Sequence, residues 1–289
     1  MENVLKKLAS LKIKCIVIPL KDGKISWDIF QEKLNNKTKL VALQRSCGYS
    51  RNSSFTIKKI DNIIKKIRKF KKDIIVFVDN CYGEFVEEVE PTYIGADLLA
   101  GSLIKNPGGG LAKTGGYIVG RKNLIEEIAT TILPGSKLEM GATYNHLHDF
   151  YQGFFIAPHI VGQALKGAIF IAKVLEKKGF QTSPLWNEAR TDIIQKIYFD
   201  SKEKLQKFCQ AIQEFSPINS TYKPIPAAVP GYNENILMAA GTFVQGASIE
   251  LSVDAPLTSP YIAYLQGGLT YSHVKVAFLL ALQKIGVKL

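Results

Sequence analysis

The first 135 residues alternate short apolar segments with amphipathic ones, and this alternation restricts the fold more than any other feature. The apolar segments are bounded by Lys, Gly, Asp or Pro, as strands covered on both faces are. Amphipathic segments predicted as helices span residues 56–71 and 121–133. The pattern predicts an α/β fold, with helices on both faces of a sheet. The predicted strands are 13–19, 39–44, 73–79, 97–103 and 115–120.

The pattern changes in the second half of the chain. Residues 134–157 look irregular, and a long helix is predicted from about Ala157 to Lys178, ending at the C-cap residue Gly179. Shorter strand-like and helix-like segments then mix, which is typical of an α+β domain. We therefore expect two domains, residues 1–156 and 157–289. Predicted strands cover 191–199, 236–243 and 248–252, and predicted helices cover 201–215 and 269–285.

The formal net charge of +12 raises the question of nucleic-acid binding. The lysines concentrate in residues 58–72, where isoleucines recur at helical spacing and the basic residues fill the opposite face. This predicts a surface helix with a solvated lysine face. No recognition motif accompanies the charge, so we expect no nucleic-acid partner.

The chain contains 46% hydrophobic and 21% charged residues, as ordinary globular proteins do. No uninterrupted apolar run approaches the roughly 20 residues that span a bilayer. The N-terminus lacks the apolar region and cleavage site of a secretory signal. The expectation is a cytoplasmic protein with no membrane partner.

Neither the cysteines nor the histidines form a metal-binding pattern. The four cysteines are scattered without a C-x-x-C pair, which favours reduced thiols. Cys47 and Cys81 fall in the loops discussed next. His146 and His148 lie close together, but no third ligand follows at a suitable spacing. We predict no metal site.

Three predicted strands end in polar loops, at the edge where α/β sheets carry their functional groups. These loops contain Gln44, Asp79 and Lys105. An aspartate closing the run IIVFV needs a cationic partner, and Lys105 offers either that cation or a nucleophilic amine. An electron-sink cofactor needs both groups, a lysine for a Schiff base and a carboxylate for a ring nitrogen. The simpler alternatives are a surface lysine before a turn and a strand-end cap at Asp79.

The order D-x-x-Y at Asp79 and Tyr82, then S-x-x-K at Ser102 and Lys105, resembles fold-type I enzymes dependent on pyridoxal 5′-phosphate (PLP). The resemblance implies a three-layer sandwich. It also implies that Asp79 pairs with the pyridine nitrogen, that Tyr82 and Gln44 reach the ring hydroxyl, that Ser102 donates to the phosphate and that Lys105 is the Schiff-base lysine.

A narrower resemblance rests on longer segments, among them QRSCGYSRNS, FVDNCYGEFVE, GADLLAGSLIKNPGGGLAKTGGYIVG and YLQGGLTYSH. These are similar to the aluminium-resistance family, which is described as methionine γ-lyase-like. That family implies PLP-dependent elimination from a sulfur amino acid, with Lys105 and Tyr82 as catalytic residues, and a homo-oligomer, dimer or tetramer. Burial or a nearby cation is expected to lower the pKa of Lys105 toward neutrality.

Further polar side chains accompany these motifs. Arg45 and Arg51 flank a Gly-Tyr turn, and either can clamp a substrate carboxylate, although a lone loop arginine is often only solvated. Residues 108–110, all glycine, permit a tight turn of the backbone. Thr258 stands where the family leads us to expect a basic residue.

The resemblance also leads us to expect a longer N-terminal part. That part would carry the first strands of the sheet and the turn that receives the cofactor phosphate. The alternative function is therefore an inactive fragment, or one subunit of a split PLP enzyme.

Overall fold

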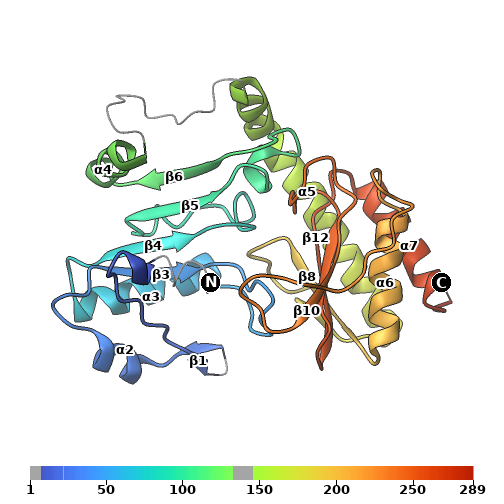
Figure 1. Cartoon of the computed structure of the whole chain (residues 1–289), viewed down its shortest axis with the longest axis horizontal. Helices are drawn as coiled ribbons and strands as arrows, with labels where there is room; N and C mark the ends of the chain where they lie inside the picture. Colours follow the sequence, from blue (N-terminus) through green and yellow to red (C-terminus); the bar gives the residue numbers. More distant parts are fainter. Residues whose placement is uncertain (1–7, 22, 133–145, 289) are drawn as a thin grey trace.

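The computed structural model describes residues 8–21, 23–132 and 146–288. In this part of the chain, two main sheets lie side by side, and the long helix α5 (Leu147–Lys177) runs from beside the N-terminal sheet to the side of the C-terminal sheet that two other helices cover (Figure 1). A two-stranded hairpin of β1 (Leu20–Lys21) and β2 (Lys24–Ile25) precedes the first sheet.

The N-terminal sheet has the order β3-β4-β5-β6. Strands β3 (Leu40–Gln44), β4 (Ile75–Asp79) and β5 (Leu98–Ser102) are parallel, and β6 (Gly116–Gly120) is antiparallel to β5. Four of the five predicted strands are confirmed. The prediction for residues 13–19 is wrong: the segment forms no sheet pairing with the described residues, and Val17 is 58% exposed.

One face of this sheet is covered as predicted. Helix α3 (Ile57–Phe70) buries its isoleucines against β4, and α2 (Trp27–Lys33), which was not predicted, adds Phe30. The lysines of α3 face away from this core. The predicted helix 121–133 is α4 (Lys122–Ile132).

The other face is more open than the prediction of helices on both faces requires. Leu40 of β3 is 45% exposed and Ile118 of β6 is 38% exposed. Both alternate with residues packed toward α3, namely Val41 and Tyr117. Side chains alternate along a strand, so Leu40 and Ile118 point to the opposite face.

The C-terminal sheet is antiparallel, with the order β7-β8-β12-β11-β10-β9. Helices α5, α6 (Lys202–Glu214) and α7 (Tyr271–Lys284) pack against it in the largest apolar core. Both α6 and α7 confirm predicted helices. The strands are β7 (Thr182–Ser183), β8 (Ile194–Phe199), β9 (Ala227–Ala228), β10 (Asn235–Ala239), β11 (Ser252–Pro256) and β12 (Tyr261–Gln266).

One strand prediction in this half is wrong, and one strand was missed. Residues 248–252 mostly form turns, in which Glu250 N–H donates to the Ala247 carbonyl and Gly268 N–H donates to the Ile249 carbonyl. Strand β11 begins only at Ser252, and β12 was not predicted.

Helix α5 begins at Leu147, not near Ala157 as predicted, and residues 133–145 lie outside the described residues. Gly153 and Pro158 weaken the helical pattern in the sequence, but both lie inside the helix. The predicted boundary between residues 156 and 157 therefore falls within α5.

In the described part of the chain, α5 is long and apolar enough, by length and composition, to cross a membrane. About a third of its apolar 18-residue window (33%) is buried, and the helix contributes Val161 to one apolar core and Ile171 to another. The core helix of a globular protein passes the same test of length and composition.

Candidate active site

The register of the N-terminal sheet brings the predicted site strands together at one edge. Gln44 pairs with Asp79 across β3 and β4, and Asp79 pairs with Ala100 across β4 and β5. Ser102 lies two residues beyond Ala100, on the same face of the sheet. Gln44, Asp79 and Ser102 therefore project from one face at the ends of adjacent strands.

The loop after β4 has an unusual backbone. Tyr82 and Phe85 adopt left-handed conformations, with φ of 73° and 62°. Such conformations cost of order 1 kcal/mol for non-glycine residues and are concentrated at functional sites. The turn begins where Asp79 Oδ1 accepts a hydrogen bond from Cys81 N–H at 3.1 Å.

Lys105 meets this loop from the next strand. Its Nζ lies 4.6 Å from the centroid of the Tyr82 ring, which is a cation–π distance. Its neighbour Asn106 is fully buried and donates from Nδ2 to the carbonyls of Tyr82 and Glu84, both at 3.0 Å. Asn106 thus fixes the backbone of Lys105 to the loop after β4.

The glycines after Lys105 were predicted to permit a tight turn, and in the structure they also permit a close approach of the backbone to α5. A Cβ at Gly109 would clash with the carbonyl oxygen of Gly153, and Gly109 has a φ of 54°. A Cβ at Gly108 would clash with the carbonyl of Leu103. The short helix η1 (Asn106–Gly108) therefore packs on α5 with almost no space between the backbones.

The pKa of Lys105 is shifted in the direction opposite to the one predicted from the sequence. Burial disfavours its ammonium form, but Tyr82, Cys81 and Asp79 outweigh burial, and the pKa of the amine is raised. The prediction of a lowered pKa is wrong because acidic groups surround the amine.

Arg45 does not point to an open site. Its side chain is fully buried, and Nη1 donates to Asn80 Oδ1 at 2.8 Å. The guanidinium also pairs with Glu87 at 3.2 Å and with Glu90 at 3.1 Å, and it donates to Thr191 Oγ1. These contacts correct the interpretation of Arg45 as a carboxylate clamp: it is a structural residue that joins the loop after β4 to the C-terminal half.

Arg51 remains accessible. It is exposed, and its Nη2 donates to the carbonyl of Ser259 at 2.9 Å. Ser259 follows Thr258, which is also exposed. The guanidinium of Arg51 therefore reaches the loop in which a basic residue was expected at Thr258.

Gln44 is exposed at the end of β3 and donates from Nε2 to the carbonyl of Ser46 at 3.1 Å. Among the described residues, no group of its own loop donates a hydrogen bond to its amide oxygen. Ser102 accepts at its carbonyl from Lys105 N–H at 3.3 Å. No contact in the structure tests the predicted roles of these two side chains.

Three polar residues next to the site were not predicted. Tyr49 Oη donates to Asp254 Oδ2 at 3.0 Å, and Asp254 is a buried carboxylate on β11 whose pKa is raised by burial. Tyr49 and Tyr82 share a small apolar cluster between the two halves. Ser248 faces the phenol of Tyr82. Tyr49 lies in a loop that the sequence had singled out, but nothing marked Asp254 or Ser248 as its partners.

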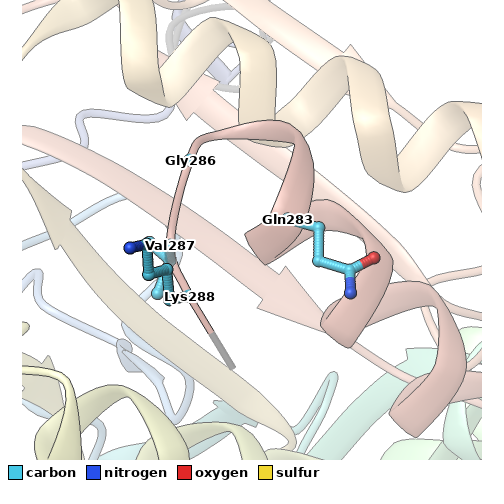
Figure 2. A pocket seen from close by; sticks show the side chains of 4 residues that line it. All are labelled: Gln283, Gly286, Val287 and Lys288. Atoms are coloured by element: carbon cyan, nitrogen blue, oxygen red, sulfur yellow. The ribbon is translucent and has the colours of Figure 1, made fainter.

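Two hollows lie away from Lys105. One, of about 290 Å³, lies between the loop after β3 and the start of β8, and is lined among others by Cys47, Ser54 and Asp192. Cys47 is thus near the junction of the two halves. The other, of about 490 Å³, is an open surface pocket at the end of α7 (Figure 2) and is lined by Gln283, Gly286, Val287 and Lys288. It includes none of the predicted site residues.

The donor set fits PLP in kind. It offers a primary amine at Lys105, a carboxylate at Asp79, a phenol at Tyr82 and a hydroxyl at Ser102, three of them on adjacent strand ends or loops. Together with the sheet topology, the placement of this set defines the class by its fold: it is the fold-type I fold, which PLP-dependent enzymes share.

Comparison with known proteins gives the family. The methionine gamma-lyase family matches residues 2–286, and the chain belongs to this family. It is 55% identical over 266 residues to the protein YnbB of Bacillus subtilis (strain 168), covering 92% of this chain and 63% of YnbB. The chain therefore spans less than two thirds of the length of that relative.

Solved structures of other proteins are also similar to this chain. A candidate cystathionine beta-lyase involved in aluminum resistance from Listeria innocua has a TM-score of 0.91 and 50% identity, over 96% of this chain and 68% of that chain. A carbon-sulfur lyase involved in aluminum resistance from Clostridium novyi NT has a TM-score of 0.88 and 46% identity, over 96% of this chain and 66% of that chain.

A more distant structure shows the fold alone. A candidate O-acetylhomoserine (thiol)-lyase from Campylobacter jejuni has a TM-score of 0.60 and 14% identity, over 98% of this chain and 73% of that chain. That protein carries N′-pyridoxyl-lysine-5′-monophosphate.

Proposed function

We propose that this chain carries the catalytic lysine of a PLP-dependent carbon–sulfur lyase that acts on a sulfur-containing amino acid, by elimination of the methionine γ-lyase kind. The observation that supports it most is the convergence of Lys105 and Tyr82, with Nζ 4.6 Å from the ring centroid, beside the strand end that carries Asp79. The named relatives involved in aluminum resistance support the same class of reaction.

In this proposal each site residue has one task. With PLP bound, Asp79 would hold the protonated ring nitrogen, Tyr82 and Gln44 would contact the ring hydroxyl, and Ser102 would donate to the phosphate. When bound, PLP supplies an electron sink for negative charge at the substrate α carbon. Lys105 Nζ accepts the proton from that carbon.

The raised pKa of Lys105 adds a requirement. An ammonium group accepts no proton, so Lys105 must first lose one. Among the described residues, Asp79 favours the charged amine, and binding of a cationic ring nitrogen by Asp79 offsets that preference.

For the substrate carboxylate we propose Arg51. Its guanidinium is exposed and is held at the 257–260 loop by the Ser259 carbonyl, next to the exposed Thr258. A guanidinium in this place supplies the positive charge that Thr258 lacks. Arg45 is excluded from the role by its buried ion pairs.

The test is PLP binding by the purified protein, followed as visible absorbance and as PLP retained after gel filtration. We expect Lys105→Ala to abolish the absorbance and Lys113→Ala to keep it, because Lys113 is an exposed lysine near the same turn. If the parent protein acquires no absorbance with excess PLP, the enzyme proposal fails for this chain.

The second candidate is a non-catalytic part, or one subunit, of a split PLP enzyme. The chain spans 63% of YnbB, and the exposed Leu40 and Ile118 leave one face of the N-terminal sheet open. This candidate predicts PLP binding only after a complementary polypeptide is added, and the same absorbance assay distinguishes the two.

We further propose a cytoplasmic homo-oligomer, dimer or tetramer, whose small-molecule partner is an amino acid and which binds neither nucleic acid nor membrane. The contributions of Val161 and Ile171 of α5 to two apolar cores support the absence of a membrane partner. Analytical ultracentrifugation checks the oligomer, and salt-dependent DNA binding would contradict the proposal.

A further inference from the structure

Three polar side chains form a row across the C-terminal sheet and face the loop after β3. Lys196 of β8 pairs with Tyr264 of β12, and Tyr264 pairs with Asp254 of β11. Residues that pair directly across antiparallel strands project from the same face of a sheet. The row therefore presents an amine, a phenol and a carboxyl group side by side.

Lys196 holds the backbone of Arg51 directly. Lys196 is 2% exposed, and its Nζ donates to the carbonyls of Arg51 and Asn52, at 3.0 Å and 2.9 Å. A lysine amine carries several N–H donors on one nitrogen, so it can bind two neighbouring carbonyls at once. Lysines are almost never fully buried unless their polar end is bound, and here the bound groups belong to the segment that carries Arg51.

The other two members of the row hold the same loop at Tyr49. Asp254 Oδ2 accepts a hydrogen bond from Tyr49 Oη at 3.0 Å, and Tyr264 Oη donates to the Tyr49 carbonyl at 2.8 Å. Tyr49 precedes Arg51 by two residues. The loop is therefore bound to the sheet both before Arg51 and at Arg51 itself.

The far end of the Arg51 side chain is held by the same sheet. Its Nη2 donates to the Ser259 carbonyl at 2.9 Å, in the loop that joins β11 to β12. These are the strands that carry Asp254 and Tyr264. An exposed side chain is thus attached at its backbone and at its guanidinium to one sheet.

We propose that Lys196 is a positioning residue for Arg51, assisted by Tyr264 and Asp254. The amine fixes the backbone from which the guanidinium extends to the 257–260 loop, and thereby fixes the direction from which that guanidinium meets a substrate carboxylate. The inference rests on the proposed function, in which Arg51 binds that carboxylate. It assigns a task to a buried lysine outside the motifs that identify the site.

The decisive variant is Lys196→Met, which keeps most of the apolar stem and removes the N–H donors. The matched control is Gln195→Leu. Gln195 is fully buried on the same strand and donates to the Pro184 carbonyl at 3.0 Å, but its side chain leaves the opposite face of β8. The readout is the NMR order parameter of the Arg51 Nε–H bond, assigned by the loss of its signal in Arg51→Lys.

We expect Lys196→Met to lower this order parameter by about a third, from the rigid to the flexible range. Gln195→Leu should leave it unchanged, even where both variants lower the stability of the protein. An unchanged order parameter in a folded Lys196→Met protein overturns the proposal, and so does an equal fall in Gln195→Leu.

A second variant covers the case in which Lys196→Met does not fold. Tyr264→Phe keeps the ring, removes the donor to the Tyr49 carbonyl, and should lower the order parameter by a smaller amount. An unchanged value in that variant then overturns the proposal. These measurements use neither PLP nor a substrate, so failure of the proposed function and failure of this inference are separate results.

Discussion

Replacing Arg45 by Met is the sharpest test of how the two halves of the chain are joined. The change removes a fully buried guanidinium and leaves the carboxylates of Glu87 and Glu90, and the amide oxygen of Asn80, without their cationic donor. Breaking a buried ion pair by removing one partner costs about 3–5 kcal/mol.

The structure places the loss near the lower end of that range. The side chains of Glu87 and Glu90 are 25% and 35% exposed, so water can solvate part of their charge. Met also fills much of the volume that the arginine stem leaves. We expect the free energy of unfolding to fall by about 3 kcal/mol.

Urea denaturation measures this loss. The control is Arg51→Met, whose exposed guanidinium makes one hydrogen bond to the Ser259 carbonyl, and which should cost less than about 1 kcal/mol. A double-mutant cycle with Glu87→Gln should give a favourable coupling between Arg45 and Glu87. A loss below about 1 kcal/mol for Arg45→Met would refute the view that Arg45 is a buried structural cation.

Three further variants test other parts of the structure. The pKa of Glu84 is about 7 in the folded state and its ordinary value is 4.5, so ionisation of Glu84 opposes folding. Relative to the parent, the free energy of unfolding of Glu84→Gln should rise by up to about 3 kcal/mol between about pH 5 and about pH 8. Urea denaturation at each pH measures this difference. Burial alone would raise the pKa of Asp97, but the Val76 N–H and Arg68 outweigh it and hold this pKa low. Asp97→Asn should therefore cost about 1.5–3 kcal/mol at neutral pH, and the loss should shrink as acid protonates the parent carboxylate, by thermal denaturation. Gly101→Ala should cost about 1–3 kcal/mol by overpacking against Glu84, which urea denaturation measures.

The sequence predicted the parallel strands well because each is a short apolar run with a clear boundary. The strand predicted at residues 13–19 was wrong because an apolar run with strand propensity forms a strand only where another strand pairs with it. The start of α5 was misplaced because Gly153 and Pro158 are unusual inside helices, yet Gly153 is what lets α5 approach η1.

The motifs at the strand ends predicted where three of the candidate site residues lie. Asp79, Tyr82 and Lys105 lie where motifs at strand ends place them. The burial of Arg45 could not be inferred, since its partners Glu87, Glu90 and Thr191 lie far along the chain. Glu84 was also missed, because only the folded register places Tyr117 beside it.

The packing of Gly153 on Gly108 and Gly109 joins α5 rigidly to the turn that carries Lys105. A helix of 31 residues is about 45 Å long, and this one is fixed near one end to the turn that carries Lys105 and near the other to the C-terminal core through Ile171 and Leu175. Backbone contact without intervening side chains leaves no soft layer to absorb a displacement. The contact between Gly153 and the turn after β5 therefore couples the position of the Lys105 backbone directly to the placement of α5.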